Sequence, residues 1–220
     1  MNCKKYFKLL AIAGSFLVMS GCATKPPFDY STYKENRPRS ILVLPPVNNT
    51  PEVQASYSVL SYASRPIAEA GYYVMPVTLV VEAFRENGIT QPTDMHAISA
   101  DKLREIFGAD AALYITIQKY GTIYAILNSA SVVTAEAKLI DLKTGKVLWT
   151  GLASASSAES QGQQSGGLAG LLVAAIVKQV MATALDQSHK VAGIATTRLL
   201  SAGRSNGMLY GPRSPNFGKD

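Results

Sequence analysis

Residues 111–157 carry the pattern that most restricts the fold of this chain. Apolar and polar residues alternate through 111–126 and again through 130–142, and a third apolar segment follows at 147–157. A period of two places successive side chains on opposite faces of a β-strand. The turn at 143–146 suits a tight hairpin because Gly145 accepts a positive φ. We therefore predict three consecutive antiparallel strands, a meander.

The segments before and after this meander predict a mixture of strands and helices. Short apolar runs at 40–44 and 72–75 indicate buried strands, and helical spacing follows between Thr50 and Gly71, over 79–87 and after Ser99. Pro66 is expected to break or kink the first of these helices. A long helix is predicted over 168–200. The fold class is therefore α/β, an α+β sandwich with a mixed sheet of about five strands. Its meander is antiparallel, helices lie on the sheet faces, and a long C-terminal helix closes the chain.

The first 22 residues have the features of a bacterial lipoprotein signal. Three lysines precede the apolar stretch 9–19, which is too short for an ordinary transmembrane helix. Ser20 and Gly21 are small and stand directly before Cys22, as cleavage on the amino side of that cysteine requires. We predict a diacylglycerol on the Cys22 thiol and an N-acyl chain on its new amino group, with no other cofactor. Ala23 follows the cysteine, where an aspartate would resemble an inner-membrane retention signal. By that resemblance, the outer membrane is the expected destination.

Cleavage changes how the charge and the cysteines are interpreted. The whole chain has a formal net charge of +6 and two cysteines, Cys3 and Cys22. Removing residues 1–21 removes three lysines and no acid, so +6 becomes +3. With no run of like charges, the sequence predicts no nucleic-acid partner. Since Cys3 leaves with the signal and Cys22 is acylated, redox chemistry is also excluded.

The chain divides into four expected regions. Residues 1–21 form the signal peptide, and 22–38, rich in proline and polar residues, form a flexible tether. Residues 39–203 form a single domain, and the glycine-rich and proline-rich segment 204–220 forms a loose tail. An extended tether of this length reaches on the order of 50 Å, which would let the domain stand off the membrane.

Catalytic and metal-binding motifs are missing from the sequence. It contains no Gly-x-Ser-x-Gly elbow, no His-Glu-x-x-His helix and no calcium loop. Asp186 and His189 are three apart on a helix, and we interpret them as a surface pair. No catalytic and no metal-binding residue is therefore assigned, and we expect a protein that is not an enzyme.

Two segments are candidates for a binding surface. The first is the loop after the first strand, because ligands bind at strand ends in open α/β sheets, although turn and cap chemistry also explains it. Its candidate residues are Pro45, Pro46, Asn48, Asn49 and Thr50. The second is the apolar start of the last helix, which suits either core packing or an interface. Its candidate residues are Leu168, Leu171, Leu172 and Ile176.

Several segments together are similar to one family of bacterial outer-membrane lipoproteins, uncharacterised in function and known as a vaccine-antigen type. The segments are 18–22, 41–50, 71–74, 83–89 and 141–149. The last of them also resembles a hairpin of the curli-secretion lipoprotein CsgG. The order of elements resembles the amino-terminal domain of TolB and the peptidoglycan-synthase activator LpoB.

The resemblance implies a compact α/β domain and a non-catalytic role in the bacterial envelope. The first hypothesis is an accessory subunit for envelope export or assembly that faces the periplasm or the cell surface. Its implied partners are envelope proteins such as a CsgG-like lipoprotein, or a second copy of the chain in a homodimer. The second is an LpoB-like activator of a peptidoglycan synthase, and the third is a weak periplasmic hydrolase. The membrane is expected to be contacted through the lipid alone.

Overall fold

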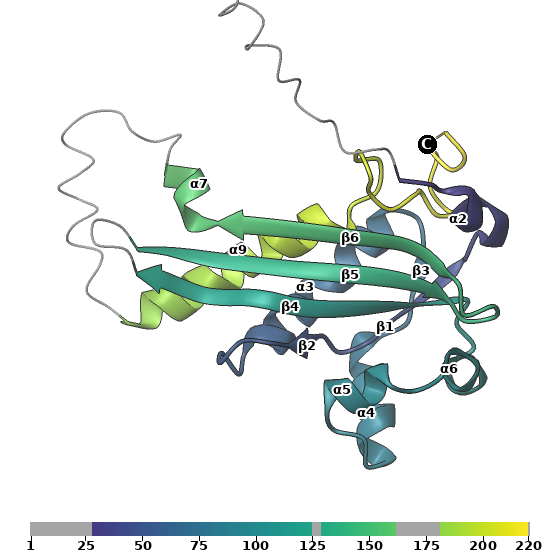
Figure 1. The fold of residues 1–220 in the computed structure, drawn as a ribbon, viewed down its shortest axis with the longest axis horizontal. Coiled ribbons are helices and arrows are strands. Elements are labelled where there is room, and N and C mark those ends of the chain that lie inside the picture. The colour runs from purple at the N-terminus through teal and green to yellow at the C-terminus, as the bar shows by residue number, and fades with distance from the viewer. Residues whose placement is uncertain (1–27, 125–128, 162–180, 220) are drawn as a thin grey trace, which may run out of the picture.

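The structure is a computed structural model that describes residues 28–124, 129–161 and 181–219. Its strands are β1 (Ser40–Val43), β2 (Val47–Asn48), β3 (Tyr73–Val74), β4 (Ala111–Tyr124), β5 (Ser129–Asp141) and β6 (Val147–Ser156). Its helices are α2 (Ser31–Asn36), α3 (Ala55–Glu69), α4 (Val77–Glu86), α5 (Pro92–His96), α6 (Ala100–Phe107), α7 (Ser157–Gln161) and α9 (Met181–Leu200). Figure 1 shows a single sheet with helices packed behind it and below one end.

The described strands form one mixed sheet in the order β3-β1-β4-β5-β6, and β2 pairs with the edge of β4 that β1 also occupies. β1 is parallel to both β3 and β4, because α3 and the α4–α6 segment provide the two crossovers. β4, β5 and β6 are antiparallel and joined in sequence. This arrangement confirms the predicted mixed sheet and its meander.

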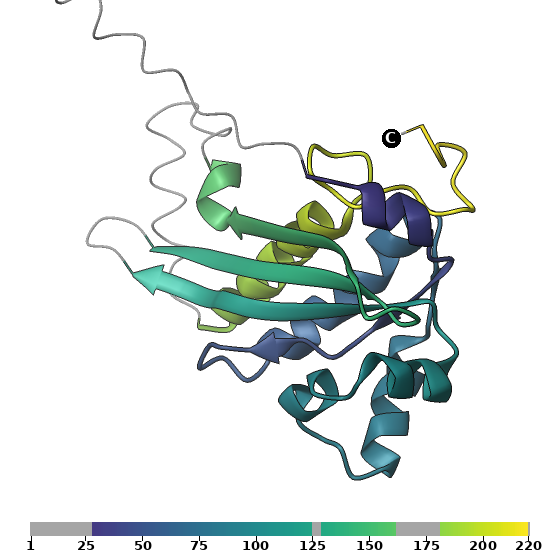
Figure 2. The ribbon, with the colours of Figure 1, turned by 45° about the vertical axis from the view of Figure 1, so that its right-hand side comes forward.

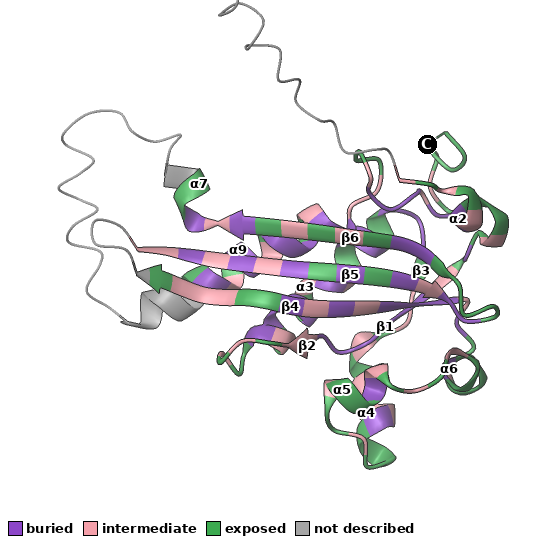
Figure 3. Ribbon diagram, in the orientation of Figure 1, coloured by how far each residue is buried: buried purple, intermediate pink, exposed green. Residues whose placement is uncertain are grey.

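One face of the sheet carries the main hydrophobic core. α3 and α9 lie across this face, as Figure 2 shows from a second angle. Every second residue of β5 from Val133 to Leu139 is buried against them, and Trp149 of β6 is 1% exposed. Figure 3 shows the resulting alternation of buried and more exposed positions along β5. The period-two pattern that predicted the meander is therefore the pattern of this core.

The opposite face is covered at one end only. There α4, α5 and α6 bury Leu42 of β1 and Ala112 of β4 in a second, smaller core around Phe84 and Leu103. Over the rest of the meander, no helix of the described chain packs on this face (Figure 2). The residues of β5 that point there, from Thr134 to Ile140, are half-buried or exposed. We call this part of the sheet the outer sheet face.

The chain before β1 differs from the expected tether. Residues 31–36 form helix α2, and its Tyr33 is 2% exposed. The hydroxyl groups of Tyr33 and Tyr72 lie 2.9 Å apart inside the protein. Apolar burial and these buried polar contacts hold the segment on the domain. The prediction of a flexible tether over 22–38 did not include this packing.

The C-terminal segment also differs from the expected loose tail. Met208 and Leu209 are buried, and the Leu209 carbonyl accepts a hydrogen bond from the Tyr72 hydroxyl at 2.7 Å. The backbone N–H of Gly211 donates to Ala70, and that of Arg213 donates to Gly71. The folded unit therefore extends from residue 28 to 219 and is wider at both ends than the predicted 39–203.

The helix that contains Pro66 also differs from expectation. Pro66 lies inside α3, which continues to Glu69 instead of breaking at the proline. The proline removes one backbone donor, but its carbonyl still accepts from Ala70, and the residue is buried. The long C-terminal helix is described from Met181 to Leu200, and its predicted start at 168–180 lies outside the described residues.

Candidate functional site

The loop after β1 is held together by its own side chains. The Oδ1 atom of Asn48 accepts from the backbone N–H of Thr50 at 3.0 Å and from its hydroxyl at 2.8 Å. The Asn48 amide nitrogen donates to the Glu52 carbonyl at 2.8 Å, and Asn49 donates to Gln118 of β4 at 3.5 Å. The predicted loop residues are thus brought together, and Asn48 and Thr50 are engaged in turn chemistry.

The prolines of this loop connect it to α5. The Nε2 atom of His96 lies 2.9 Å from the carbonyl oxygen of Pro45. Because a carbonyl can only accept, Nε2 carries the proton and donates. The His96 ring also stands edge-on to Tyr114 of β4, with centroids 5.1 Å apart. His96 therefore joins the predicted loop to the outer sheet face.

Burial governs the ionisation of both rings. It lowers the pKa of His96 below its ordinary value, and the hydrogen bond to Pro45 opposes that shift. Burial likewise raises the pKa of the Tyr114 phenol. At neutral pH both rings are uncharged, so this edge of the sheet offers hydrogen-bonding groups without charge.

A broad open groove runs from His96 across the outer sheet face. Its volume is about 650 Å³, and it is lined by residues of β4, β5 and β6 as well as α5. Two rows of paired residues that run across β4, β5 and β6 form its floor. One row is Tyr114, Lys138 and Thr150, and the other is Thr116, Glu136 and Leu152. The Leu152 side chain is 70% exposed.

The chemistry of this groove suits recognition of a polypeptide. It combines hydroxyl groups, one ammonium group at Lys138 and one carboxylate at Glu136, which accepts from Gln118 at 2.9 Å. An exposed leucine beside paired polar groups is typical of the mixed polar and apolar surfaces that proteins use to bind one another. Among the described residues no group of three or more His, Cys, Asp or Glu side chains is arranged to hold a metal ion.

A second polar cluster lies between α3, α9 and β4. Tyr120 donates to the Ser58 Oγ atom at 2.8 Å, and that atom lies 2.6 Å from Nδ1 of His189. The Tyr62 ring packs against the His189 ring with centroids 4.8 Å apart. Ser58 is 6% exposed, so this chain of hydrogen bonds satisfies buried polar groups and orients α9 on α3.

This cluster had no signal in the sequence. Ser58 and His189 are 131 positions apart, and no spacing rule connects them. The predicted surface pair of Asp186 and His189 stays a prediction, because the Asp186 side chain lies outside the described residues. The structure gives His189 a serine partner on another helix.

The remaining predicted site residues lie outside the described residues. These are the lipid-attachment residue Cys22 and the interface candidates Leu168, Leu171, Leu172 and Ile176. In the described part of the chain, no helix is both long enough and apolar enough to cross a membrane.

Comparison with known proteins identifies the family. The family model described as "Putative lipoprotein GNA1162-like" matches residues 28–213. The chain belongs to the GNA1162-like lipoprotein family. Within it, the chain is 45% identical over 199 residues to "Putative lipoprotein NMB1124/NMB1162" of Neisseria meningitidis serogroup B, covering 90% of this chain and 92% of that protein.

One solved structure supports this assignment. The crystal structure of lipoprotein GNA1162 from Neisseria meningitidis is 46% identical to this chain, with a TM-score of 0.53, and the match covers 64% of this chain and 97% of that one. The LpoB C-terminal domain from Escherichia coli is 16% identical, with a TM-score of 0.34, over 54% of this chain and 83% of that one. The family resemblance inferred from the sequence is confirmed, and the protein is a member of a lipid-anchored envelope family.

Proposed function

We propose that this lipoprotein is a non-catalytic accessory subunit of an envelope export or assembly complex, anchored to the outer membrane through Cys22. The observation that carries the proposal is the groove on the outer sheet face, which is open to solvent and is lined at one end by His96, the hydrogen-bond partner of Pro45. The family membership supports the lipid anchor, and the small residues before Cys22 support that residue as its site.

The outer sheet face suits a protein partner because paired strands hold its residues in place and no helix of the described chain covers them. Backbone pairing of β4, β5 and β6 fixes the positions of the groove residues. An open antiparallel sheet face is normally polar, yet Leu152 of the edge strand β6 stands beside Glu136 with most of its side chain in water. A partner that covers Leu152 gains apolar burial of up to about 2 kcal/mol at this position.

The binding experiment compares two exposed leucines. The lipidated protein is crosslinked in its own envelope and recovered as wild type, Leu152→Asp or Leu79→Asp. Leu79 lies on α4 and is 67% exposed, close to the 70% of Leu152, so it is a matched control. We expect Leu152→Asp to lose the partner recovered by wild type and Leu79→Asp to keep it. Equal recovery by all three forms would contradict the assigned face.

The anchor has a separate experiment. Cys22→Ser should remove the acyl chains and leave the precursor uncleaved, because the modified thiol is the substrate of the cleavage step. Mass spectrometry of the purified protein measures both effects. A processed, acylated Cys22→Ser protein would show that the lipid is attached elsewhere.

A further inference from the structure

The described chain begins at one end of the domain, on the C-terminal segment. The backbone N–H of Phe28 donates to the Asn206 Oδ1 atom at 2.9 Å, and the Tyr30 hydroxyl donates to the carbonyl of Gly207. Phe28 and Tyr30 also pack edge to face, with ring centroids 5.0 Å apart. These contacts fix the point at which the chain from Cys22 reaches the fold.

The remaining length of chain is short. Six residue steps separate Cys22 from Phe28, and covalent geometry limits them to a span of about 20 Å, whatever their conformation. A compact unit of this size is roughly 40 Å across, from the usual relation between chain length and radius of gyration. A lipid on Cys22 therefore holds the end formed by α2 and the C-terminal segment close to the membrane surface, and the reach of about 50 Å expected from the sequence does not apply.

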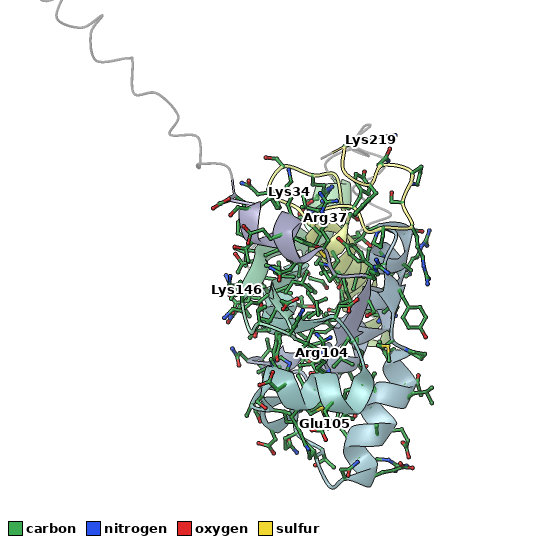
Figure 4. All side chains as sticks on the ribbon, turned by 90° about the vertical axis from the view of Figure 1, so that its right-hand side faces the viewer. Lys34, Arg37, Arg104, Glu105, Lys146 and Lys219 are labelled. Atoms are coloured by element: carbon green, nitrogen blue, oxygen red, sulfur yellow. The ribbon has the colours of Figure 1, made fainter. Side chains whose placement is uncertain are left out.

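This end of the protein is basic. Figure 4 views the molecule from this end and shows four basic residues on the facing surface: Lys34 of α2, Arg37 directly after α2, Lys146 of the β5–β6 turn and Lys219 of the C-terminal segment. All four are exposed. Arg104 and Glu105 of α6 lie lower in the same view. Glu105 forms an ion pair with Lys102, with 2.9 Å between the ammonium and the carboxylate.

The acidic groups near these cations are fewer. Asp29 and Glu35 lie in the same N-terminal segment, and the Asp29 carboxylate accepts from the Ser31 N–H at 2.9 Å. Asp110 is occupied with the backbone N–H groups of Arg39 and Ser40. Asp141 beside the β5–β6 turn is buried and accepts from Thr144. Since Arg39, Lys143 and Arg213 are further exposed cations, the balance of charge among the described residues of this end is positive.

Aromatic rings accompany the cations. The Arg37 guanidinium lies over the ring of Phe217, 5.5 Å from its centroid, and Arg213 lies over Tyr73 at the same distance. Phe217 is 38% exposed and Tyr73 is 42% exposed. Aromatic rings and long basic side chains together are typical of surfaces that meet lipid headgroups, where one part of each side chain is apolar and the other is wet.

We propose that the surface formed by α2, the β5–β6 turn and residues 211–219, here called the basic end, docks on anionic lipid headgroups. The inference rests on the lipid anchor of the proposed function and adds a second contact between the protein and the membrane. The anchor supplies a high local concentration of headgroups, and the cations and aromatic rings fix the orientation. Docking directs the outer sheet face sideways along the membrane, where partners anchored in the same leaflet can reach it.

The test uses the full acylated protein in vesicles. A cysteine replaces either Asn216 at the basic end or Glu86 on α4, and each carries a fluorophore. Both positions are exposed, and an acylated Cys22 leaves the introduced thiol as the reactive one. The vesicles contain a nitroxide-labelled lipid in phosphatidylcholine, with or without phosphatidylglycerol. Lipid nitroxide quenches a fluorophore that lies at the headgroup surface.

We expect stronger quenching at position 216 than at 86, and only in vesicles that contain phosphatidylglycerol. The difference should disappear in 1 M salt, where the screening length is about 3 Å. Lys146→Glu with Lys219→Glu should lower the docked-to-undocked ratio by about fivefold or more for each lysine replaced. Lys119→Glu with Lys138→Glu, an equal change of charge on the outer sheet face, should leave the ratio unchanged.

The two proposals fail in different ways. If mass spectrometry finds no lipid on Cys22 and the protein does not float with vesicles, the anchor itself is wrong. If the acylated protein floats but position 216 is quenched no more than 86, docking is overturned and the anchor stands. In that case the basic end would bind an acidic protein surface instead of lipid headgroups. Quenching that ignores phosphatidylglycerol would also overturn the proposal, because charge would not be its cause.

Discussion

Trp149 and Gly151 allow a direct test of how closely the main core is packed. They lie two residues apart on β6 and face the same side of the sheet. A Cβ atom added at position 151 would overlap the six-membered ring of Trp149 and would stand 3.2 Å from the Leu199 Cδ1 atom of α9. The indole cannot move freely, since its Nε1 atom donates to the Asn206 carbonyl at 2.9 Å. We therefore predict that Gly151→Ala destabilises the fold.

The magnitude follows from three contributions. Overpacking a buried site costs about 1–3 kcal/mol, and losing the Trp149–Asn206 hydrogen bond costs about 1 kcal/mol more. The reduced entropy of the unfolded chain returns about 0.4–1 kcal/mol. The net loss is roughly 1–3.5 kcal/mol. For a domain of this size, each kcal/mol lowers Tm by about 2–4 °C.

Denaturant titration monitored by fluorescence measures this loss. Trp149 is the single tryptophan of the chain, so its emission reports on the site directly. Thr150→Ala is the control, because Thr150 is exposed on the opposite face and should change the free energy of unfolding by no more than about 0.5 kcal/mol. A Gly151→Ala protein as stable as wild type would refute the packing described here.

Three further predictions concern the polar contacts. Ser58→Ala removes the group that joins Tyr120 to His189 and should cost about 1–3 kcal/mol in denaturant titration; an unchanged midpoint would contradict a role in seating α9. Tyr72→Phe removes the hydroxyl that donates to Leu209 and should cost about 1–2 kcal/mol, with faster proteolysis of the C-terminal segment by mass spectrometry. Because burial lowers the pKa of His96, the unfolded chain binds the proton first, and stability falls as pH drops below about 6.5. His96→Gln should therefore lose less Tm than wild type between neutral pH and pH 5, and parallel profiles would count against the buried ring.

The meander could be predicted from the sequence because its energetics are periodic. In β5, Val133 and Leu139 face the core while Glu136 and Lys138 face water. The alternation of apolar and polar residues therefore predicts which side chains face the core. Gly145 has a φ of +68°, as the predicted hairpin turn needs. Local chemistry of this kind requires no knowledge of distant residues.

The two ends of the domain could not be predicted in the same way. Tyr33 and Leu209 are both buried, yet they lie in segments rich in proline, glycine and polar residues. They are held through Tyr72, and that contact joins positions far apart in the chain. Composition alone indicated a tether and a tail, because the burial that orders these segments is entirely non-local.

The groove residues were not predicted from the sequence. The loop at 45–50 was predicted from its place at the end of β1, and its role in binding stays a prediction. Its Pro45 carbonyl accepts from His96, which lines the groove. The groove itself comes from cross-strand neighbours such as Glu136 and Leu152, which are 16 residues apart and acquire their relation from the register of β5 and β6. Register depends on the folded sheet, so no motif could have named these residues together.

Site-specific photocrosslinking in living cells tests the central claim most directly. A photoreactive amino acid is placed at position 152 on the outer sheet face or at position 79 on α4, in the lipidated protein at its native level. Both positions hold exposed leucines, so they differ in place rather than in chemistry. An accessory subunit that binds through its outer sheet face gives one discrete crosslinked envelope protein from position 152 and none from 79. The same products from both positions, or none from 152, would contradict the account.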